Sequence, residues 1–427
     1  MMPSVGYSGR MFVLCKIYFQ NYIMKNNYKV SCSLQKAHRI ILNNIKSKSG
    51  EIIVLQEARR RIVSGDIAAV TPQPSFDEST RDGYVIFLYP GSEEKPNNYE
   101  IVGEIPAGKP YLNSLVPGTA CRIMTGGCVP KGSTRVVPFE DCIEQNGTVI
   151  VADPSLLPAE TFIKKTGSEI AGGEILVPGG VALQAGHLAL LASCGMHSVE
   201  VAARPLAGHV CTGSELTATS EGLEIGQKVS SNSFLIDGLL AAVGARPVNM
   251  GIIKDTERDV LDLFAKVRTD ELDVMITTGG MGPGKYDLVE RVFVEAGGKV
   301  LFNSLSMRPG KSVLFGILGR TLVFGLPGPP YAVRALLNEL VGPALLAMQG
   351  AKGLWPEEAQ AHLLHRINIK RNDILRLKDG VLTFSEGKCL VRFAGRLEIP
   401  NCFILLPPGQ SHYSEGALVE VHLANKL

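Results

Sequence analysis

The spacing of apolar residues changes several times along the chain, and each change predicts a different local structure. Two runs between residues 33 and 68, LQKAHRIILNNI and EIIVLQEARRRIVSGDI, have helical spacing and are separated by the turn-like KSKSG. From residue 72 to about residue 160, Gly, Pro and Asn interrupt short apolar runs, which predicts strands at 99–102, 120–124, 135–138 and 148–151. Residues 168–203 are rich in glycine and predict short strands with one helix near 186–192.

From residue 205 onward, strand-like and helix-like segments alternate. The predicted strands are 206–211, 247–253, 273–277, 299–303, 312–315 and 321–324, and the predicted helices are 233–243, 258–267, 287–295 and 331–348. Such alternation is typical of a parallel α/β sheet. After residue 353 the pattern returns to short strands such as LLHRINI, LVRFAG, CFILLP and ALVEVHL, which predicts a second β-domain.

We therefore predict an α/β plus β protein made of six segments. They are an N-terminal extension (1–32), a helical segment that contributes to the linker and α/β domains (33–70), a β-rich domain (71–167), a Gly-rich linker domain (168–204), an α/β domain (205–353) and a C-terminal β-barrel domain (354–427).

Composition excludes several classes of protein. With 45% apolar residues a core can form, and 46 glycines with 25 prolines argue against a helical bundle. The 43 Lys and Arg nearly balance 41 Asp and Glu, so we expect no nucleic-acid partner. The apolar run at 11–23 is too short and too polar to span a membrane, and we interpret residues 1–23 as an appendage or a misassigned start. We expect the nine cysteines to be reduced thiols, as in a cytoplasmic protein.

Metal-binding patterns based on cysteine or histidine are weak in this sequence. No two cysteines form C-x-x-C, which excludes a readable zinc ribbon or thioredoxin-type motif. His362 and His365 have H-x-x-H spacing, but the local pattern is that of a strand and no further ligand is near in sequence. We therefore interpret this pair as part of an ordinary strand.

Three glycine-containing loops follow predicted strands of the α/β domain, at 211–216, 277–287 and 324–330. Ligands of open α/β sheets bind outside the carboxyl ends of the strands, and glycines allow backbone N–H groups to approach an anion. Tight turns between strands and helices explain the glycines about as well. The loop residues that we expect to contact a ligand are Thr278, Gly279, Gly280, Gly282, Gly325, Pro327 and Gly328.

Charged residues near these loops indicate which ligand they suit. Arg308 and Lys311 flank a Pro-Gly turn, where an Arg fork and a Lys charge both suit phosphate, although solvated loop charges also explain them. Glu215, Asp255 and Asp287 lie at or near loops on the same predicted edge. Together with a phosphate-bearing ligand, these carboxylates suit Mg²⁺, which binds carboxylates, waters and phosphate oxygens.

Six motifs, in this order, resemble those of the MoeA and gephyrin E-domain family, the molybdopterin molybdenumtransferases. In this chain they read PSFDESTRDGY, RIMTGGCVPKGST, TGSEL, TGGMGPGKYD, MRPGKS and GLPGPP. The order and approximate spacing agree from about residue 33 to residue 427, which is nearly the whole chain.

The resemblance implies an elongated multidomain enzyme whose central three-layer α/β domain binds molybdopterin. Such an enzyme inserts molybdate into adenylylated molybdopterin and releases AMP, with Mg²⁺ as cofactor. The family's functional acids fall on Asp82, Glu215, Asp255 and Asp287, its threonine on Thr125 and its second loop cation on Lys311. Family members are elongated dimers, so the resemblance implies a cytoplasmic homodimer. The ligand would lie between the α/β domain of one subunit and the domain of the other subunit that carries Asp82 and Thr125. Other molybdenum cofactor biosynthesis proteins are further implied partners.

Several positions depart from the family pattern. Lys164 and Lys165 stand where the family has two arginines, Arg308 replaces a lysine, Ser214 replaces an aspartate and Pro329 replaces an asparagine. Two alternatives therefore stay open beside the enzyme. One is a chaperone that binds molybdopterin without turnover, and the other is a gephyrin-like scaffold that binds a peptide.

Overall fold

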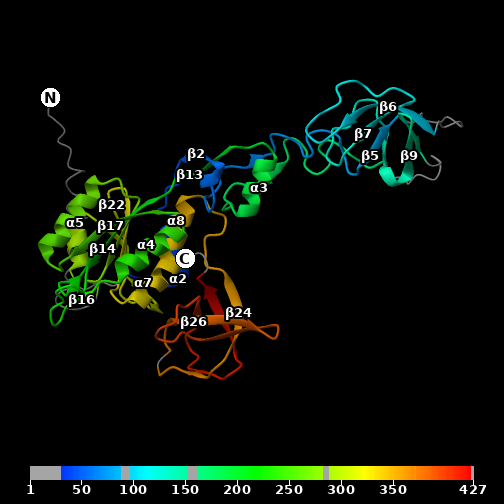
Figure 1. The fold of residues 1–427 in the computed structure, drawn as a ribbon. Coiled ribbons are helices and arrows are strands. Elements are labelled where there is room, and N and C mark those ends of the chain that lie inside the picture. Colours follow the sequence, from blue (N-terminus) through cyan, green and yellow to red (C-terminus); the bar gives the residue numbers. More distant parts are fainter. Residues whose placement is uncertain (1–29, 88–96, 152–160, 282–287, 371, 425–427) are drawn as a thin grey trace, which may run out of the picture. The chain divides into compact units, whose positions relative to one another are not determined.

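The structure is a computed structural model, and it describes residues 30–87, 97–151, 161–281, 288–370 and 372–424. The chain forms two compact units (Figure 1). One contains the chain up to residue 51 together with residues 202–427, and the other contains residues 52–201. Residues 1–23, which the sequence analysis interprets as an appendage, lie outside the described residues.

The unit of residues 52–201 begins with a small region around one helix. There α3 (Ala185–Ser193) packs with two-stranded sheets, in which β2 (Gly50–Val54) pairs with β13 (Ser198–Ala202) and β3 (Ile67–Ala68) pairs with β12 (Ile175–Val177). The second helix predicted between residues 51 and 67 is wrong, because this stretch forms β2 and then a single 3-10 turn, η1 (Leu55–Glu57). Three β-branched residues in a row favour a strand, and β13 supplies its partner.

The larger part of this unit is a six-stranded sheet with the order β8-β5-β7-β6-β10-β9. Its strands are β5 (Gly83–Ile86), β6 (Asn98–Ile105), β7 (Thr119–Ile123), β8 (Arg135–Pro138), β9 (Cys142–Gln145) and β10 (Thr148–Val151). Tyr84 and Ile86 belong to one buried cluster and Val85 to another, as expected when alternate residues of a strand point to opposite faces. The four strands predicted here are confirmed. Beside the sheet, β4 (Glu78–Ser79) pairs with β11 (Ile163–Lys164), and η2 (Phe139–Asp141) follows β8.

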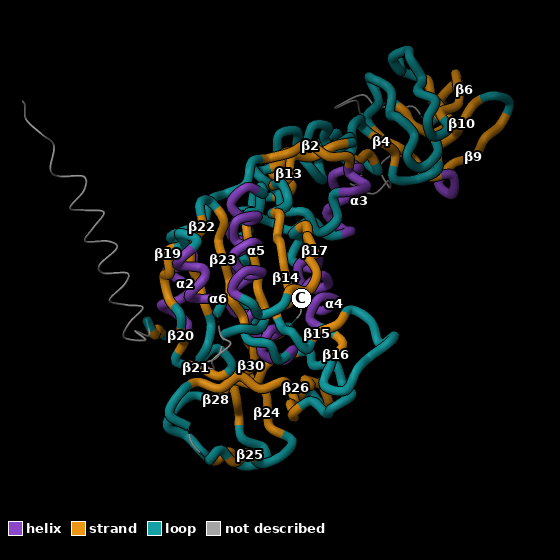
Figure 2. The backbone as a smooth tube through the Cα atoms, turned by 90° about the vertical axis from the view of Figure 1, so that its left-hand side faces the viewer, coloured by secondary structure: helices purple, strands orange, loops and turns teal. Residues whose placement is uncertain are grey.

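The other unit contains a six-stranded α/β sheet with the order β17-β14-β18-β23-β22-β19 (Figure 2). Its strands are β14 (Leu206–Thr212), β17 (Arg246–Ile253), β18 (Val274–Thr278), β19 (Lys299–Phe302), β22 (Leu314–Leu318) and β23 (Thr321–Leu326). The first four strands in this order are parallel, whereas β22 and β19 are antiparallel to their neighbours. The prediction of a parallel sheet is therefore correct for four strands only, because short connections join β19, β22 and β23 where a parallel crossover would need a helix.

Helices cover both faces of this sheet and make three layers. Along β18, Val274 and Ile276 point into one apolar cluster and Met275 points into the other. The helices of the first cluster are α2 (Leu34–Leu42), α4 (Asn232–Ala242), α7 (Pro330–Leu336), η3 (Leu337–Val341) and α8 (Gly342–Met348), and those of the second are α5 (Glu257–Thr269) and α6 (Val289–Glu295). The three-layer α/β fold is confirmed.

The predicted helix at 331–348 is continuous but contains a π-helical segment, η3. By length and apolar composition the run Pro330–Met348 resembles a membrane span, but 78% of it is buried inside the structure. It is therefore the core helix of the α/β layer. The wider π turn places the side chain of Glu339 among buried residues, and Glu339 itself has no exposed surface.

The C-terminal strands form a barrel with the order β26-β27-β24-β30-β28, closed by pairing of β28 with β26. They are β24 (Glu358–Leu363), β26 (Leu375–Ser385), β27 (Lys388–Phe393), β28 (Cys402–Leu406) and β30 (Leu418–Leu423). The short strand β21 (Met307–Arg308) of the α/β region pairs with β26, and an ion pair between Arg334 and Asp379 joins α7 to the barrel. Remaining two-stranded pairs are β1 (Ser31–Cys32) with β20 (Ser304–Leu305), β15 (Leu216–Thr217) with β16 (Lys228–Val229), and β25 (Ile367–Asn368) with β29 (His412–Tyr413).

Candidate active site at the carboxyl edge of the α/β sheet

The strand order of the α/β sheet creates a natural ligand site. The chain runs from β14 to β17 on one side of it, and then to β18 on the other side. The direction of winding therefore reverses beside the carboxyl end of β14, and such switch points are where open α/β sheets bind ligands. A cavity of about 490 Å³ lies here, lined by the ends of β14 and β18 and by the loop after β23.

Glycines form part of the cavity wall, and the backbone requires glycine at two of them. Gly279 has φ +94° and Gly280 has φ +64°. A Cβ atom on Gly279 would lie 2.3 Å from the carbonyl oxygen of Thr212, so no side chain fits. On the opposite loop, a Cβ atom added to Gly328 would lie 3.9 Å from the Cα of Gly279. The two loops therefore approach closely and leave bare backbone facing the cavity, as an anionic ligand needs.

The N-terminus of α4 also faces the cavity, through Ser230, Ser231 and Asn232. The Asn232 side-chain amide donates hydrogen bonds to the carbonyl oxygen of Gly328 at 2.8 Å and to the Thr278 hydroxyl at 3.4 Å, which ties three loops together. Its Oδ1 atom is buried and accepts no hydrogen bond from the described residues. The first N–H groups of a helix lack partners within it, so this end favours a negatively charged group.

Two of the predicted acids line the same cavity. Asp255 accepts hydrogen bonds from the backbone N–H of Ser214 at 3.0 Å and from the Ser214 hydroxyl. The hydroxyl bond is the main cause that holds the pKa of the Asp255 carboxyl below its usual range. The carboxylate of Glu215 lies against Gly213, where a Cβ would come within 2.7 Å of Glu215 Oε2. Both carboxylates are therefore available to a cation or a polar ligand in this cavity.

A second, positively charged cavity adjoins the first, and Pro329 lines both. It has a volume of about 320 Å³ and contains Arg308 and Lys311 together with Arg376 and Lys378 from the barrel strand β26. Parallel pairing of β21 with β26 places Arg308 opposite Arg376. A hydrogen bond of 2.9 Å from the Ser304 hydroxyl to the carbonyl oxygen of Lys311 holds the cationic turn. Four cations around a small cavity suit a compact oxyanion.

The remaining predicted site residues have different places. Pro327 lines the cationic cavity. Gly325 lies inside β23, where a Cβ would contact Met281 and Leu314, so glycine is needed there for the close packing of these side chains. Gly282 and Asp287 lie outside the described residues.

Asp82 and Thr125 come together in the other unit of the chain. The carboxylate of Asp82 accepts hydrogen bonds from the backbone N–H of Thr125 at 2.6 Å and from its hydroxyl at 2.9 Å. The backbone hydrogen bond is the larger cause that lowers the pKa of Asp82. Nearby, Asp77 accepts hydrogen bonds from Lys165 at 2.7 Å and from the backbone of Thr166 at 2.8 Å, so a lysine that departs from the family pattern still pairs with the first motif.

Sequence reasoning missed several residues of the two cavities. Arg376 and Lys378 were missed because they come from another domain, and only the pairing of β21 with β26 brings them near. By contrast, the polar run of Ser230, Ser231 and Asn232 could have been found, since such residues typically begin helices. Lys228, the remaining charged residue of the larger cavity, lies in the short strand β16.

These features define a multidomain α/β protein whose cavity at the switch point of its sheet is a candidate site for an anionic ligand. Comparisons with known proteins agree with this class. Residues 208–347 match the family described as "Probable molybdopterin binding domain", and residues 32–195 match the "MoeA N-terminal region (domain I and II)".

Curated relatives match along almost the whole chain. A molybdopterin molybdenumtransferase of Bacillus subtilis is 31% identical over 403 residues, which cover 91% of this chain and 93% of that protein. One from Nostoc is 31% identical and covers 90% of this chain and 92% of its own. Two crystal structures of the molybdopterin biosynthesis MoeA protein of Pyrococcus horikoshii are also similar, and each covers 92% of this chain. One is 27% identical with a TM-score of 0.79 and is matched over 99% of its own chain. The other is 25% identical with a TM-score of 0.73 and is matched over 100% of its own chain. The chain belongs to the molybdopterin molybdenumtransferase family, which confirms the resemblance indicated by its six motifs.

Proposed function

We propose that this protein is a molybdopterin molybdenumtransferase, which inserts molybdate into adenylylated molybdopterin and releases AMP in molybdenum cofactor biosynthesis. The observation that carries the proposal is the pair of cavities that share Pro329. The larger cavity, with its glycine wall and helix N-terminus, suits the phosphate groups of the adenylylated substrate. The smaller one, with four cations, suits molybdate, a compact dianion.

The larger cavity is built to hold a phosphoanhydride. Backbone N–H groups near Gly279 and Gly280, together with the start of α4, favour the negative charge that grows on phosphate oxygens as the bond to AMP breaks. The donors are fixed before the substrate arrives, because the hydrogen bond of Asn232 to Gly328 and the glycine conformations hold the loops. No reorganisation is then needed during cleavage.

Asp255 and Glu215 are the residues that would hold Mg²⁺. Both line the cavity, and the hydrogen bonds of Ser214 keep Asp255 ionised, which fits an ion that binds carboxylates, water and phosphate oxygens. When bound, Mg²⁺ would neutralise phosphate charge during anhydride cleavage. Asp287, outside the described residues, remains a proposed third acid on the basis of the family motif.

The cationic cavity would position molybdate beside the substrate. Lys311 and Lys378 are exposed, so an oxyanion can enter the cavity from solvent. Arg376 is half-buried, and its planar guanidinium can donate hydrogen bonds in a fixed direction. With molybdate held next to the dithiolene, cleavage of the adenylate and insertion of the metal become coupled steps of two bound reactants. Positioning of this kind explains why AMP release would depend on molybdate.

The homodimer, the cytoplasmic location and contacts with other cofactor biosynthesis proteins are part of the same proposal. Asp82 and Thr125 are hydrogen-bonded to each other and exposed at the surface of their unit, as a pair that completes a partner subunit's site should be. The chaperone and scaffold alternatives gain no support from the comparisons, since the relatives that match over almost the whole chain carry the name of the transferase.

The test is an assay of AMP release from adenylylated molybdopterin, with and without molybdate. The enzyme should release AMP only when molybdate is present, and Asp255→Asn should abolish most of that release. A chaperone would bind the substrate without turnover in both conditions. A scaffold would bind peptide equally well with Asp255 or Asn at this position, and either outcome would refute the proposal.

A further inference from the structure

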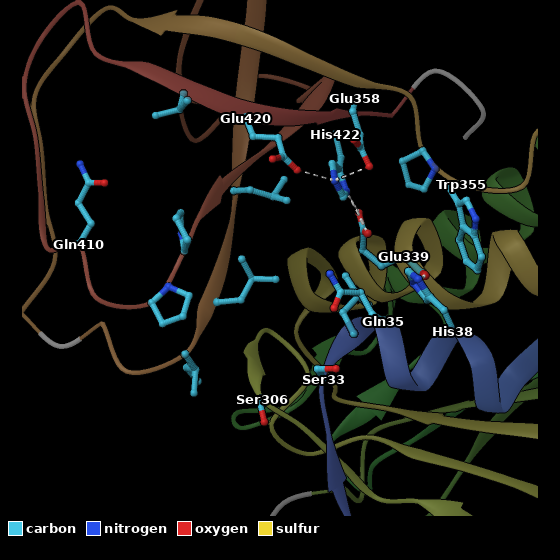
Figure 3. A pocket seen from close by; sticks show the side chains of 18 of the residues that line it. Ser33, Gln35, His38, Ser306, Glu339, Trp355, Glu358, Gln410, Glu420 and His422 are labelled. Carbon is cyan, nitrogen blue, oxygen red and sulfur yellow. Dashed lines mark hydrogen bonds and ion pairs between the residues drawn. The ribbon is translucent and has the colours of Figure 1, made fainter.

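A cluster of titratable side chains lies away from both cavities of the proposed active site. It consists of Glu358, Glu420 and His422 in the barrel, and Glu339 of η3 contacts the His422 ring from the helix below it (Figure 3). In the part of the chain that the structure describes, the first three form the one group whose possible ligand atoms all lie within 4.8 Å of one another. None of these residues belongs to the six family motifs.

Strand pairing fixes the three barrel residues on one face. Glu358 of β24 is the direct register partner of His422 of β30, and Glu420 lies two residues before His422 on the same strand. Alternate residues of a strand point to the same side, and direct partners of antiparallel strands are neighbours. The backbone therefore brings one imidazole and two carboxylates together without help from a loop.

The imidazole has a defined orientation. Its Nδ1 atom lies 3.0 Å from both carboxylate oxygens of Glu339, which has no exposed surface. The side-chain amide of Asn338 donates a second hydrogen bond to Glu339 at 3.0 Å. A buried carboxylate that accepts from one ring nitrogen fixes the proton there and leaves the lone pair of the other nitrogen for a metal, an arrangement common at zinc ligands.

The other ring nitrogen, Nε2, faces the two remaining carboxylates. Its distances are 3.3 Å to Glu420 Oε1 and 3.8 Å to Glu358 Oε1 (Figure 3). Ligand atoms that are about 2.0–2.2 Å from a tetrahedral zinc ion lie roughly 3.4 Å from one another. The two nitrogen–oxygen distances are therefore close to the spacing around a shared ion, and all three ligand atoms lie within 4.8 Å of one another.

Exposure and charge also suit an ion that enters from solvent. The His422 side chain is 9% exposed, whereas those of Glu420 and Glu358 are 45% and 67% exposed. Three carboxylates surround one imidazole, so negative charge exceeds what a single protonated ring can neutralise. The cluster also lines a cavity of about 860 Å³, which provides room for water ligands on the open side of an ion.

We propose that His422, Glu420 and Glu358 bind a divalent transition-metal ion of the zinc class, with Glu339 as the residue that orients His422. A nitrogen ligand with two carboxylates suits zinc and its neighbours, whereas Mg²⁺ and Ca²⁺ prefer oxygen ligands alone. Because Glu339 belongs to η3 and the ligands belong to the barrel, the ion would stabilise the contact between these two parts of the same unit.

The test uses the full chain, stripped of metal with a chelator and dialysed against Zn²⁺ in excess Mg²⁺. The Mg²⁺ occupies sites made of oxygen ligands alone. We expect one zinc ion per chain and a rise in melting temperature when zinc is added. A Glu358→Gln/Glu420→Gln variant should lose at least about tenfold in zinc affinity, the lower limit seen when even an orienting partner is removed. Both replaced side chains are well exposed, so the metal-free variant should fold normally, with an unchanged circular dichroism spectrum.

Glu415→Gln, which changes an exposed glutamate of the same barrel, is the matched control and should bind zinc as the unchanged protein does. Co²⁺ in place of Zn²⁺ should give visible absorption without a thiolate charge-transfer band. Equal zinc affinity in the double variant, no zinc bound to the unchanged protein, or a thiolate band from cysteine ligands would each overturn the proposal.

Discussion

Replacement of Gly279 by alanine should separate a steric effect at the active site from ordinary backbone strain. The residue has φ +94°, and an added Cβ would lie 2.3 Å from the carbonyl oxygen of Thr212 and 2.9 Å from its hydroxyl oxygen. Backbone oxygen cannot move as a side chain can, so the loop after β18 must shift. That shift would move the N–H groups that we propose for phosphate binding.

The magnitude can be set against a matched glycine. Gly297, after α6, has φ +88°, but no heavy atom lies within 4 Å of its ideal Cβ position. Gly297→Ala should therefore cost only the left-handed strain, about 1–2 kcal/mol of unfolding free energy. Gly279→Ala adds a steric clash of about 1–3 kcal/mol, for a total of about 2–5 kcal/mol.

The assay is urea unfolding of both variants beside turnover. The chain has one tryptophan, Trp355, which stacks on His38 at 4.1 Å between ring centroids, so its fluorescence reports unfolding of this unit. Gly297→Ala should keep molybdate-dependent turnover near normal, and Gly279→Ala should lose most of it under conditions where both are folded. Equal destabilisation of the two variants, with normal turnover in both, would refute the reasoning about the glycine wall.

Four further predictions concern individual side chains. Asp255→Asn should reduce turnover about a hundredfold, on the scale of one electrostatic catalytic group. Ser214→Ala removes the hydroxyl hydrogen bond that lowers the pKa of Asp255, so the acidic limb of the pH–rate profile should move to higher pH. An unmoved limb would contradict the role of Ser214. Lys311→Ala and Lys378→Ala should each raise the KM for molybdate, more strongly at low ionic strength, and an unchanged KM would remove molybdate from the cationic cavity. Mixing inactive Asp82→Ala and Asp255→Ala chains should restore part of the activity if two subunits share each site, whereas a mixture without activity would argue against the composite dimer site.

Local patterns predicted most of the elements around the active site. The strands β14, β18 and β23 are buried on both faces and read as apolar runs, and each ends in a glycine loop at nearly the predicted residue. Parallel strands bring their carboxyl ends to one edge, so the loops at Thr212, Thr278 and Gly328 had to meet there. The positions of Glu215 and Asp255 followed from the same rule.

Features that depend on distant pairing could not be predicted in this way. Residues 51–67 have helical spacing, but β2 forms there because β13, far along the chain, offers a strand partner. Arg376 enters the cationic cavity only because β21 pairs with a barrel strand. The cluster around His422 was invisible for the same reason, since cross-strand register and a π turn, not sequence spacing, bring Glu358 and Glu339 to it.

The most direct measurement of the central claim is a single-turnover experiment with adenylylated molybdopterin bound to the protein. AMP and newly formed molybdenum cofactor are quantified in the same samples after molybdate is added. The proposed function predicts that both products appear at the same rate and in equal amounts, with neither formed without molybdate. AMP released at the same rate in the absence of molybdate, or stable binding of the substrate with no AMP when molybdate is present, would contradict it.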